Sequence, residues 1–534
     1  MMESLLSVEN LTITFGNGFK AVDNISFNIN SGESFALVGE SGSGKSLTAL
    51  SVLKLLPQQA QLSATAIRLK QTDLLSMPEF ELCRIRGKRV SFIFQDPMSS
   101  LNPVMTIGEQ IAEVLKLHTG LANEPCRQRV LELLKQVEIP SPEQKITAYP
   151  HQLSGGQRQR IMIAIALAGE PDLLIADEPT TALDVTIQAQ ILELLKKLQQ
   201  QNGMTLWLIS HDLALVSMMA DRVAVMQQGK IVELGPCRDV FQNPRHSYTQ
   251  KLLKALPSIQ NCPAESAANP AAALLQVSDF YCYYPIRKGI FQRVVDYVKA
   301  VDGVSFTLDR GRTLALVGES GCGKTTLGKS LLGLIKGSRG RVWLDQTDLS
   351  SLSDEALRQK RAEIQIIFQD PYSAMNPRML VGDIIGEGIQ ALFPQTPDLE
   401  RSAKVLDLLQ QVGLPADSAM RYPHEFSGGQ RQRICIARAL AVEPKLIVCD
   451  EPTSALDVSV QAQIIELLKK LQQEKGISYL FITHNLAVVA EIAQEVAVMY
   501  KGKIIEYGSV QQVLKAPQQA YTQKLLSTVP ELAF

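Results

Sequence analysis

The sequence predicts an α/β protein made of two tandem domains, each built on a mainly parallel β-sheet. The first observation is a repeat: "SGGQRQRIMIAIALAGEPDLLIADEPTTALD" at 154–184 returns as "SGGQRQRICIARALAVEPKLIVCDEPTSALD" at 427–457. The second is that two apolar runs, "SFALVG" and "LALVG", each lead through a glycine-rich turn into a segment of helical periodicity. The third is that strands and helices alternate along each half, which favours parallel sheets.

Length and the repeat together indicate where the domains begin and end. A chain of 534 residues is too long for one hydrophobic core. The segment "LPSIQNCPAESAANPAAA" between the copies mixes Pro, Ser, Asn and Ala without periodicity, as linkers do. We therefore expect a first domain over residues 1–257, a linker over 258–273 and a second domain over 274–534.

The individual elements follow from apolar patterns within each copy. Helices are predicted where apolar residues recur at three and four positions, and strands where short apolar runs are bounded by turn residues. The predicted strands are 34–39, 205–210, 314–318 and 478–483, and the predicted helices are 46–56, 187–200, 325–335 and 460–473.

The front parts of the two copies differ in length. The second copy carries extra residues near "IRKGIFQRVVDY". Further along the chain it lacks a smaller number of residues that the first copy has. Insertions of this kind normally lie in surface loops. The basic residues Arg287, Lys288 and Arg293 are expected to form a solvated hairpin, with a phospholipid or permease contact as the alternative.

Composition excludes several classes of protein. The 53 Lys and Arg residues balance the 54 Asp and Glu residues, so the chain lacks the positive field of a nucleic-acid binder. The sequence shows neither an apolar run that could span a membrane nor a secretory signal, which predicts a cytoplasmic location. The eight cysteines lack paired short spacings and are expected to be reduced thiols.

Two glycine-rich turns, "GESGSGKS" at 39–46 and "GESGCGKT" at 318–325, fit the phosphate-loop pattern. Glycines let successive backbone N–H groups curl around phosphate oxygens, and the following helix N-terminus adds favourable partial charge. A chance glycine-rich turn is the alternative, but each match lies between a predicted strand and helix. The predicted nucleotide-binding residues are Gly39, Ser41, Gly42, Ser43, Gly44, Lys45, Ser46, Gly318, Ser320, Gly321, Cys322, Gly323, Lys324, Thr325 and Thr326.

Paired carboxylates end the apolar strands of "LLIADE" and "LIVCDE". Because strand side chains alternate, Asp177 and Asp450 can hold Mg²⁺ while the adjacent Glu178 and Glu451 polarise an attacking water. An acidic turn after a buried strand is the alternative.

A histidine follows the next apolar strand in each copy, in "LISHD" and "FITHN". We expect His211 and His484 to contact the γ-phosphate, with an ordinary strand-end histidine as the alternative.

Two further motifs, "LSGGQ" at 153–157 and "FSGGQ" at 426–430, resemble the signature of ATP-binding cassette (ABC) ATPases. The resemblance covers nearly the whole chain twice, through "FQDP", "DEPT" and "ALD" in both halves. It implies two P-loop NTPase nucleotide-binding domains in tandem, each with an antiparallel β subdomain and a helical subdomain. It also implies ATP hydrolysis, with ATP and Mg²⁺ bound. Phe426 replaces the leucine that is usual in the family.

In that family the signature of one domain covers the nucleotide held by the phosphate loop of the other, so the resemblance implies that the two cassettes pair within this chain. The implied catalytic residues are Glu178, Glu451, His211, His484, Gln95 and Gln369. The implied Mg²⁺ ligands are Ser46, Thr325, Gln95, Gln369, Asp177 and Asp450. The signature residues are Ser154, Gly155, Gly156, Gln157, Ser427, Gly428, Gly429 and Gln430. Phe15 and Tyr284 would stack on adenine, with simple packing as the alternative.

The words "YPHQLSGGQRQR" and "YPHEFSGGQRQR", and the endings "SYTQKLL" and "AYTQKLL", resemble the fused ATPase subunits of bacterial peptide, glutathione and nickel importers, most closely those of oligopeptide and microcin C uptake. The resemblance implies a peripheral subunit on the cytoplasmic face of the inner membrane. Its partners would be two integral-membrane permeases and an extracytoplasmic substrate-binding protein, which together would choose a cargo that this sequence does not name.

Some relatives carry a cysteine cluster after the cassette. Only Cys262 stands near that place here, so no iron–sulfur cluster is expected.

The alternative from another class is a soluble twin-cassette ATPase that acts on ribosomes. Such proteins carry a long charged linker and a basic surface, whereas this linker is short and alanine-rich. An exporter ATPase is a further alternative, but exporters usually fuse the cassette to membrane helices, and the importer-like "YPH" precedes both signatures here. A DNA-repair cassette would need zinc-ligand cysteine pairs, which this sequence lacks.

Cys322 lies inside the second phosphate loop. Backbone donors and a helix N-terminus there favour a thiolate, which predicts selective alkylation that MgATP prevents, with an inert spacer as the alternative.

Overall fold

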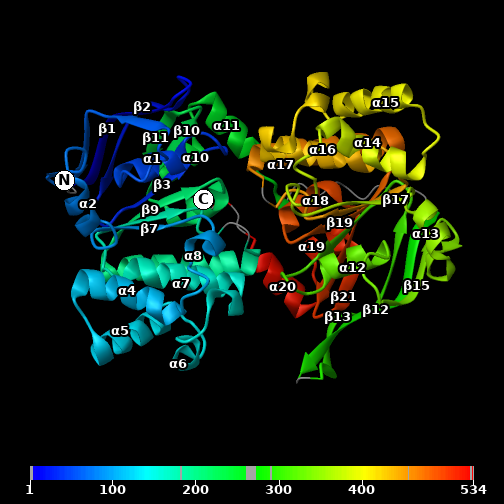
Figure 1. Cartoon of the computed structure of the whole chain (residues 1–534), viewed down its shortest axis with the longest axis horizontal. Helices are drawn as coiled ribbons and strands as arrows, with labels where there is room; N and C mark the ends of the chain where they lie inside the picture. The colour runs from blue at the N-terminus through cyan, green and yellow to red at the C-terminus, as the bar shows by residue number, and fades with distance from the viewer. Residues whose placement is uncertain are drawn as a thin grey trace. The chain divides into compact units, whose positions relative to one another are not determined.

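The computed structural model describes residues 4–180, 183–259, 272–288, 291–454, 456–529 and 532. The chain divides into two compact units, Met1–Leu256 with Pro530–Phe534 and Pro257–Val529. Most of the predicted linker, residues 260–271, lies outside the described residues, as does Cys262. Each unit repeats the same set of layers (Figure 1).

The first unit contains a six-stranded sheet in the order β11-β10-β3-β9-β8-β7. All neighbouring strands pair in parallel, except that the edge strand β11 pairs antiparallel to β10. The strand bounds are β3 (Ser34–Val38), β7 (Val90–Ile93), β8 (Leu173–Asp177), β9 (Thr205–Ser210), β10 (Arg222–Gln227) and β11 (Lys230–Pro236). β3, β8 and β9 are buried along their whole length, which explains why they read as continuous apolar runs.

A second, wholly antiparallel sheet in this unit has the order β2-β1-β5-β6, with β4 also paired to β1. Its strands are β1 (Ser4–Phe15), β2 (Lys20–Asn30), β4 (Ala60–Ser63), β5 (Ala66–Leu69) and β6 (Thr72–Asp73). The helices are α1 (Lys45–Val52), α2 (Glu79–Ile85), α3 (Pro97–Ser100), α4 (Ile107–Thr119), α5 (Asn123–Gln136), α6 (Pro142–Lys145), α7 (Gly155–Leu167), α8 (Val185–Asn202), α9 (Leu213–Met219), α10 (Cys237–Gln242) and α11 (Ser247–Lys254).

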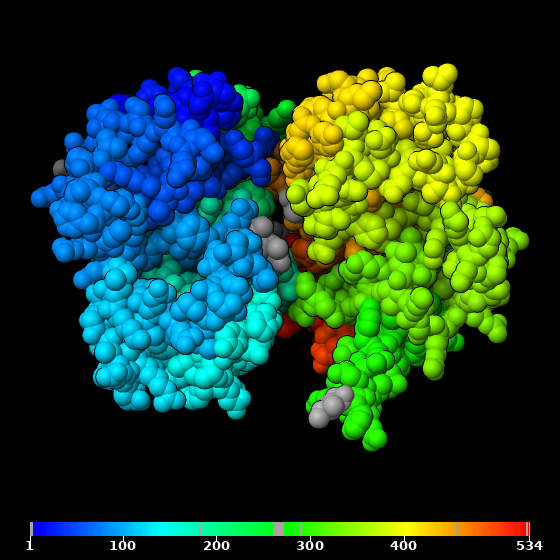
Figure 2. All heavy atoms as spheres, in the orientation of Figure 1, coloured from blue at the N-terminus to red at the C-terminus, as the bar shows by residue number. Residues whose placement is uncertain are grey.

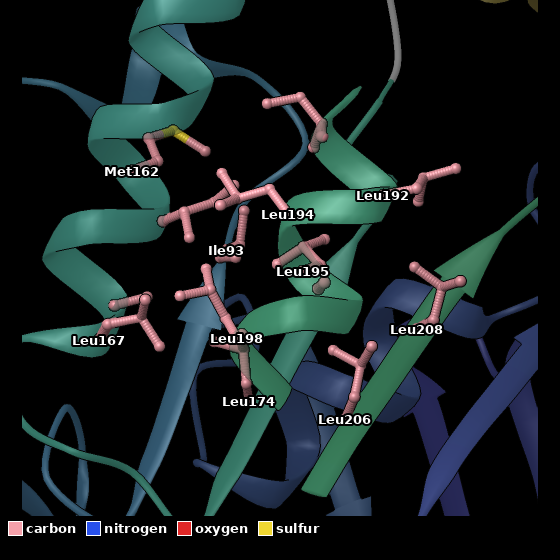
Figure 3. Packing of buried hydrophobic residues seen from close by; sticks show 14 of the residues in the cluster. Ile93, Met162, Leu167, Leu174, Leu192, Leu194, Leu195, Leu198, Leu206 and Leu208 are labelled. Carbon is pink, nitrogen blue, oxygen red and sulfur yellow. The ribbon is translucent and has the colours of Figure 1, made fainter. Parts of the chain in front are cut away.

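The parallel sheet separates two apolar cores, because alternate side chains of its strands point to opposite faces. One face packs against α4, α5, α7 and α8 through Ala36, Leu174, Leu206 and Leu208. Figure 3 shows α7 and α8 resting on this face, with Leu195 and Leu198 directed toward the strands. The other face packs against the antiparallel sheet and α1 through Phe35, Leu173, Ile175 and Trp207. Trp207 is fully buried and meets the ring of Phe27 edge-on at 5.3 Å between centroids.

The second unit has the same two sheets, β17-β18-β19-β14-β20-β21 and β13-β12-β15-β16. Its strands are β12 (Ala273–Lys288), β13 (Arg293–Asp309), β14 (Thr313–Val317), β15 (Arg339–Leu344), β16 (Thr347–Asp348), β17 (Ile364–Ile367), β18 (Leu446–Asp450), β19 (Ser478–Thr483), β20 (Glu495–Tyr500) and β21 (Lys503–Ser509). Its helices are α12 (Lys324–Leu331), α13 (Asp354–Lys360), α14 (Val381–Leu392), α15 (Asp398–Gln411), α16 (Gly428–Leu440), α17 (Val458–Lys475), α18 (Leu486–Ile492), α19 (Val510–Lys515) and α20 (Ala520–Ser527).

The predicted fold class is confirmed in both units. Each has a mainly parallel sheet, an antiparallel β subdomain and a helical subdomain, formed by α4 and α5 in the first unit and α14 and α15 in the second. Among the described residues, no helix combines the length and apolarity needed to cross a bilayer.

Two helices end earlier than the sequence pattern predicts. α1 ends at Val52 and α12 at Leu331. Lys54 (φ 51°) and Gly333 (φ 66°) adopt the left-handed conformation just beyond these ends, and such a residue stops the helical hydrogen bonding.

The prediction of a surface loop near Arg287 is wrong. β12 and β13 contain 16 and 17 residues, against 12 and 11 in β1 and β2, because the extra residues continue the antiparallel pairing. The resulting ribbon projects from the second unit (Figure 2). Its Val and Tyr residues have the β-propensity that loops lack. Arg287, Lys288 and Arg293 are exposed on it, as expected for a solvated hairpin.

Candidate functional site

The two phosphate loops have the same backbone conformation, and close contacts require their glycines. Gly39 and Gly318 have φ values of 153° and 151°, and a Cβ on either would lie 2.2 Å from a carbonyl oxygen, that of Met226 or Met499. Gly44 (φ 102°) precedes α1 with equally little space, since a Cβ there would lie 2.5 Å from the Ala21 carbonyl oxygen. No other residue fits these positions without moving the backbone.

The lysine of each loop is buried and holds the loop's own carbonyl groups. Lys45 Nζ donates to the carbonyl oxygens of Gly39 and Glu40, both at 2.8 Å. Lys324 Nζ donates in the same way to Gly318 at 2.6 Å and Glu319 at 3.0 Å. Each ammonium therefore lies inside the curl of the loop, and its predicted role in binding nucleotide remains a prediction.

A hydroxyl and a carboxylate meet beside each loop. Ser46 Oγ donates to Asp177 Oδ1 at 3.0 Å, and Thr325 Oγ1 donates to Asp450 Oδ1 at 2.8 Å. Burial raises the pKa of Asp177 to about 6, and it also raises the pKa of Asp450. Hydroxyl and carboxylate oxygens are the ligands that Mg²⁺ takes when it also binds a nucleotide, so these residues fit that ion.

The next carboxylate along each chain segment contacts a glutamine and a histidine from neighbouring strands. Gln95 Nε2, after β7, donates to Glu178 Oε2 at 2.7 Å, and His211 Nδ1, after β9, lies 3.2 Å from Glu178 Oε1. In the second unit Gln369 Nε2 and His484 Nδ1 lie 2.9 and 3.2 Å from the carboxylate oxygens of Glu451. The ends of three parallel strands thus bring together the residues that the sequence predicted to be catalytic.

The backbone of this carboxylate is unusual in both units. Glu178 (φ 47°) and Glu451 (φ 48°) are left-handed, which costs energy in a residue other than glycine and is frequent at functional sites. Burial alone would raise the pKa of Glu451, but His484, Lys324 and Gln369 hold the pKa of this carboxyl below its ordinary value. Glu451 is therefore ionised at neutral pH and can accept a proton.

Each signature begins a helix. Ser154 caps α7 and its Oγ accepts the N–H of Gln157, whose side chain in turn accepts the Ser154 N–H. Ser427 and Gln430 make the same capping box at α16. Gly156 and Gly429 pack against Ile187 and Val460, where a Cβ would be 2.7 and 2.4 Å from side-chain carbon. The two serines remain exposed, with the helix N-termini beside them.

The two predicted adenine contacts occupy different places in their hairpins. Phe15 ends β1 and is half-buried, whereas Tyr284 lies within the longer β12 and is 41% exposed. That either ring stacks on adenine remains a prediction.

The prediction of a thiolate at Cys322 is wrong. The thiol packs in the apolar core beneath the loop and is 8% exposed. Burial raises the pKa of Cys322 above its ordinary value, even though Lys324 Nζ lies 3.8 Å from Sγ. The cost of desolvating a thiolate thus exceeds the attraction of the nearby donors.

Sequence reasoning missed two tyrosines that touch the phosphate loops. The hydroxyl of Tyr248 accepts the backbone N–H of Glu40 at 3.2 Å, and that of Tyr521 accepts the N–H of Glu319 at 3.1 Å. A signal was present, because "SYTQKLL" and "AYTQKLL" recur in the two copies, but nothing local indicates which distant residue a tyrosine meets.

Comparison with known families matches this arrangement. The family model described as ABC transporter matches residues 22–181 and 301–454. A second model, described as oligopeptide/dipeptide transporter, C-terminal region, matches residues 232–284 and 505–534.

Several curated relatives are similar over nearly the full chain. The chain is 50% identical to the peptidoglycan transport ATP-binding protein YejF of Agrobacterium fabrum, across 98% of this chain and 96% of that protein. It is 47% identical to an uncharacterized ABC transporter ATP-binding protein YejF of Escherichia coli K12, across 99% and 100%. It is 46% identical to the glutathione import ATP-binding protein GsiA of Escherichia coli O157:H7, across 99% and 90%.

Proposed function

This chain belongs to the ABC transporter family as a twin-cassette ATPase, and from that premise we propose that it powers the import of peptides or related small solutes across a bacterial inner membrane. The observation that carries the proposal is the match to the oligopeptide/dipeptide transporter region in both copies. Relatives named for peptidoglycan transport and glutathione import support the same class of cargo. The ribosome alternative finds no support among these relatives.

Each phosphate loop is proposed to bind one ATP. Lys45 and Lys324 would exchange their loop carbonyl partners for the β- and γ-phosphate oxygens, and the loop N–H groups would hold the same phosphates. Ser46 and Asp177 in the first cassette, with Gln95, would hold Mg²⁺; the ion supplies charge neutralisation when bound. Thr325, Asp450 and Gln369 would hold it in the second.

The proposed proton acceptors are Glu178 and Glu451. Gln95 and Gln369 orient the carboxylates by donating to one oxygen, which leaves lone pairs for an attacking water. His211 and His484, beside the other oxygen, would turn a ring nitrogen toward the γ-phosphate. The left-handed backbone of each glutamate fixes its side chain at the strand end, where these contacts meet.

We propose that each signature completes the nucleotide site of the opposite cassette. Ser154 and Ser427, with the N–H groups of the glycines that follow, would donate to a γ-phosphate when the cassettes pair. Their exposure within their own units supports this role. ATP would then favour the paired state, and hydrolysis would release it.

The proposed partners are two integral-membrane permeases, served by an extracytoplasmic substrate-binding protein, with this chain peripheral on the cytoplasmic face. The test is affinity capture of the tagged chain from gently solubilised membranes, followed by mass spectrometry. Two polytopic membrane proteins should co-purify, and addition of the matching binding protein with peptide should raise ATP turnover.

The matched control is the same capture with Lys45→Ala and Lys324→Ala together, which should retain the permeases but lose turnover. Capture of ribosomes, or of no membrane protein, would overturn the proposed transport role while leaving the ATPase assignment intact.

A further inference from the structure

The peptide group between Gly39 and Glu40 starts the first phosphate loop, and it is held from both sides. Its carbonyl oxygen accepts from Lys45 Nζ at 2.8 Å, and its N–H donates to the Tyr248 hydroxyl at 3.2 Å. The second loop repeats both contacts at the peptide between Gly318 and Glu319. Two independent copies of the fold therefore place a tyrosine at the same point.

Each tyrosine comes from the end of its cassette and is fixed by a glutamate. Tyr248 lies on α11, and Glu233 of β11 accepts the two N–H groups that precede that helix, from Arg245 at 2.9 Å and His246 at 3.2 Å. Tyr248 is itself buried, so its hydroxyl cannot swing away into solvent.

In the second copy a glutamate likewise accepts the N–H groups before the helix that carries the tyrosine, but the neighbours of the tyrosine ring differ. Glu506 of β21 accepts from the N–H groups of Gln518 and Gln519 and from the Thr522 hydroxyl before and within α20. The Tyr521 ring packs on Tyr500 with 4.3 Å between centroids. Burial raises the pKa of Tyr521, so its hydroxyl stays neutral.

The lysine contact is the one that changes when nucleotide binds, because the ammonium is drawn toward the phosphates. The tyrosine contact then remains to keep the peptide oriented. We propose that Tyr248 and Tyr521 are positioning residues for the phosphate loops, through which the C-terminal segment of each cassette sets nucleotide affinity. This inference rests on the nucleotide sites proposed above.

The test compares Tyr248→Phe and Tyr521→Phe, which remove only the hydroxyl. Each variant is measured in a chain whose other nucleotide site is disabled. Tyr248→Phe is combined with Lys324→Ala, and Tyr521→Phe is combined with Lys45→Ala. Loss of one neutral hydrogen bond should raise the Kd for both ATP and ADP by about two- to tenfold. The kcat at saturating ATP should change by less than about twofold, since the catalytic carboxylate is untouched.

The matched control is Tyr507→Phe, whose hydroxyl bonds the Thr307 carbonyl and Glu495 away from the loops. It should leave both Kd and kcat unchanged. Unchanged Kd in the two test variants, an equal loss in the control, or a fall in kcat without a change in Kd would overturn the inference. An unsubstituted chain that binds no nucleotide would instead overturn the proposed sites themselves.

Discussion

The two phosphate loops and the two β-hairpins that precede them have diverged to very different degrees. The loop glycines agree closely in backbone angle, at 153° and 151° for Gly39 and Gly318 and 102° and 111° for Gly44 and Gly323. The hairpins differ in length by several residues, and only the second forms a projecting ribbon. The two loops thus keep the same backbone conformation with only small changes of side chain, while the hairpins differ in length.

The largest expected effect tests whether the two sites are equivalent. Glu178→Gln and Glu451→Gln keep the side-chain shape but cannot accept a proton, so each should lower ATP turnover, and by the same amount. The double variant should lose about 100-fold or more, as expected for removal of a general base.

Turnover is measured by phosphate release at saturating ATP, with nucleotide binding as the control for an intact site. Normal turnover in either single variant would show that one cassette is not hydrolytic, despite its matching contacts.

The next effect concerns the hairpins. Phe15→Ala and Tyr284→Ala should each weaken ATP binding at their own site by about 5- to 100-fold, because stacking on a base contributes about 1–3 kcal/mol. Equilibrium binding is measured with the opposite loop disabled. Inorganic triphosphate, which lacks a base, should bind each variant and the unsubstituted chain equally.

The exposed rings Phe19 and Tyr297 from the same hairpins provide matched alanine controls. A loss that is equal for ATP and triphosphate would mean that Phe15 or Tyr284 only packs the hairpin.

A smaller difference is Ser43 in one loop and Cys322 in the other. Since the pKa of Cys322 is raised, its thiolate fraction at pH 7.5 is lower than that of an ordinary cysteine and grows only at more alkaline pH. Iodoacetamide at pH 7.5 should modify the exposed Cys83 and spare Cys322 in the folded chain.

Peptide mass spectrometry measures both sites, and the urea-unfolded chain serves as the control in which Cys322 reacts. Rapid modification of Cys322 in the folded chain, with protection by MgATP, would restore the thiolate prediction.

The smallest effect concerns the residues that follow His211 and His484. Asp212 and Asn485 cap α9 and α18 through the same pairs of backbone N–H groups. Burial raises the pKa of Asp212, so the folded state binds this proton more tightly than the unfolded chain does. Its contribution therefore favours folding at low pH and is lost as pH rises through the folded pKa.

Asp212→Asn should accordingly raise the melting temperature of the chain at pH 7.5 by a few degrees, about 2–4 °C for each kcal/mol, and should not raise it near pH 4. Differential scanning calorimetry at both values measures this. Equal shifts at the two pH values would mean that the charge of Asp212 is not the cause.

Sequence patterns predicted the strands, the phosphate loops and the carboxylates because each depends on a short local signal. β9 and β19 occur at the predicted residues, since fully buried parallel strands are continuous apolar runs. The neutral state of Cys322 was mispredicted because it depends on a core assembled from distant segments.

The tyrosine contacts were missed for a related reason. Tyr248 and Glu40 are 208 residues apart in the sequence and meet only after β10, β11 and α11 have folded. No local pattern therefore specifies their hydrogen bond. The left-handed backbone of Glu178 was also hidden, because the sequence shows a glutamate where glycine would have signalled that conformation.

The chain contains two tryptophans, one in each cassette. Trp207 is fully buried between the sheets of the first cassette. Trp343 is half-buried on β15 of the second, with the Arg341 guanidinium 6.0 Å from its ring centroid. Their surroundings differ in polarity, so Trp207 should emit at shorter wavelength than Trp343. Each half of the molecule thus carries its own fluorophore. With Trp343→Phe or Trp207→Phe, intrinsic fluorescence can follow the melting of one cassette at a time inside the intact chain.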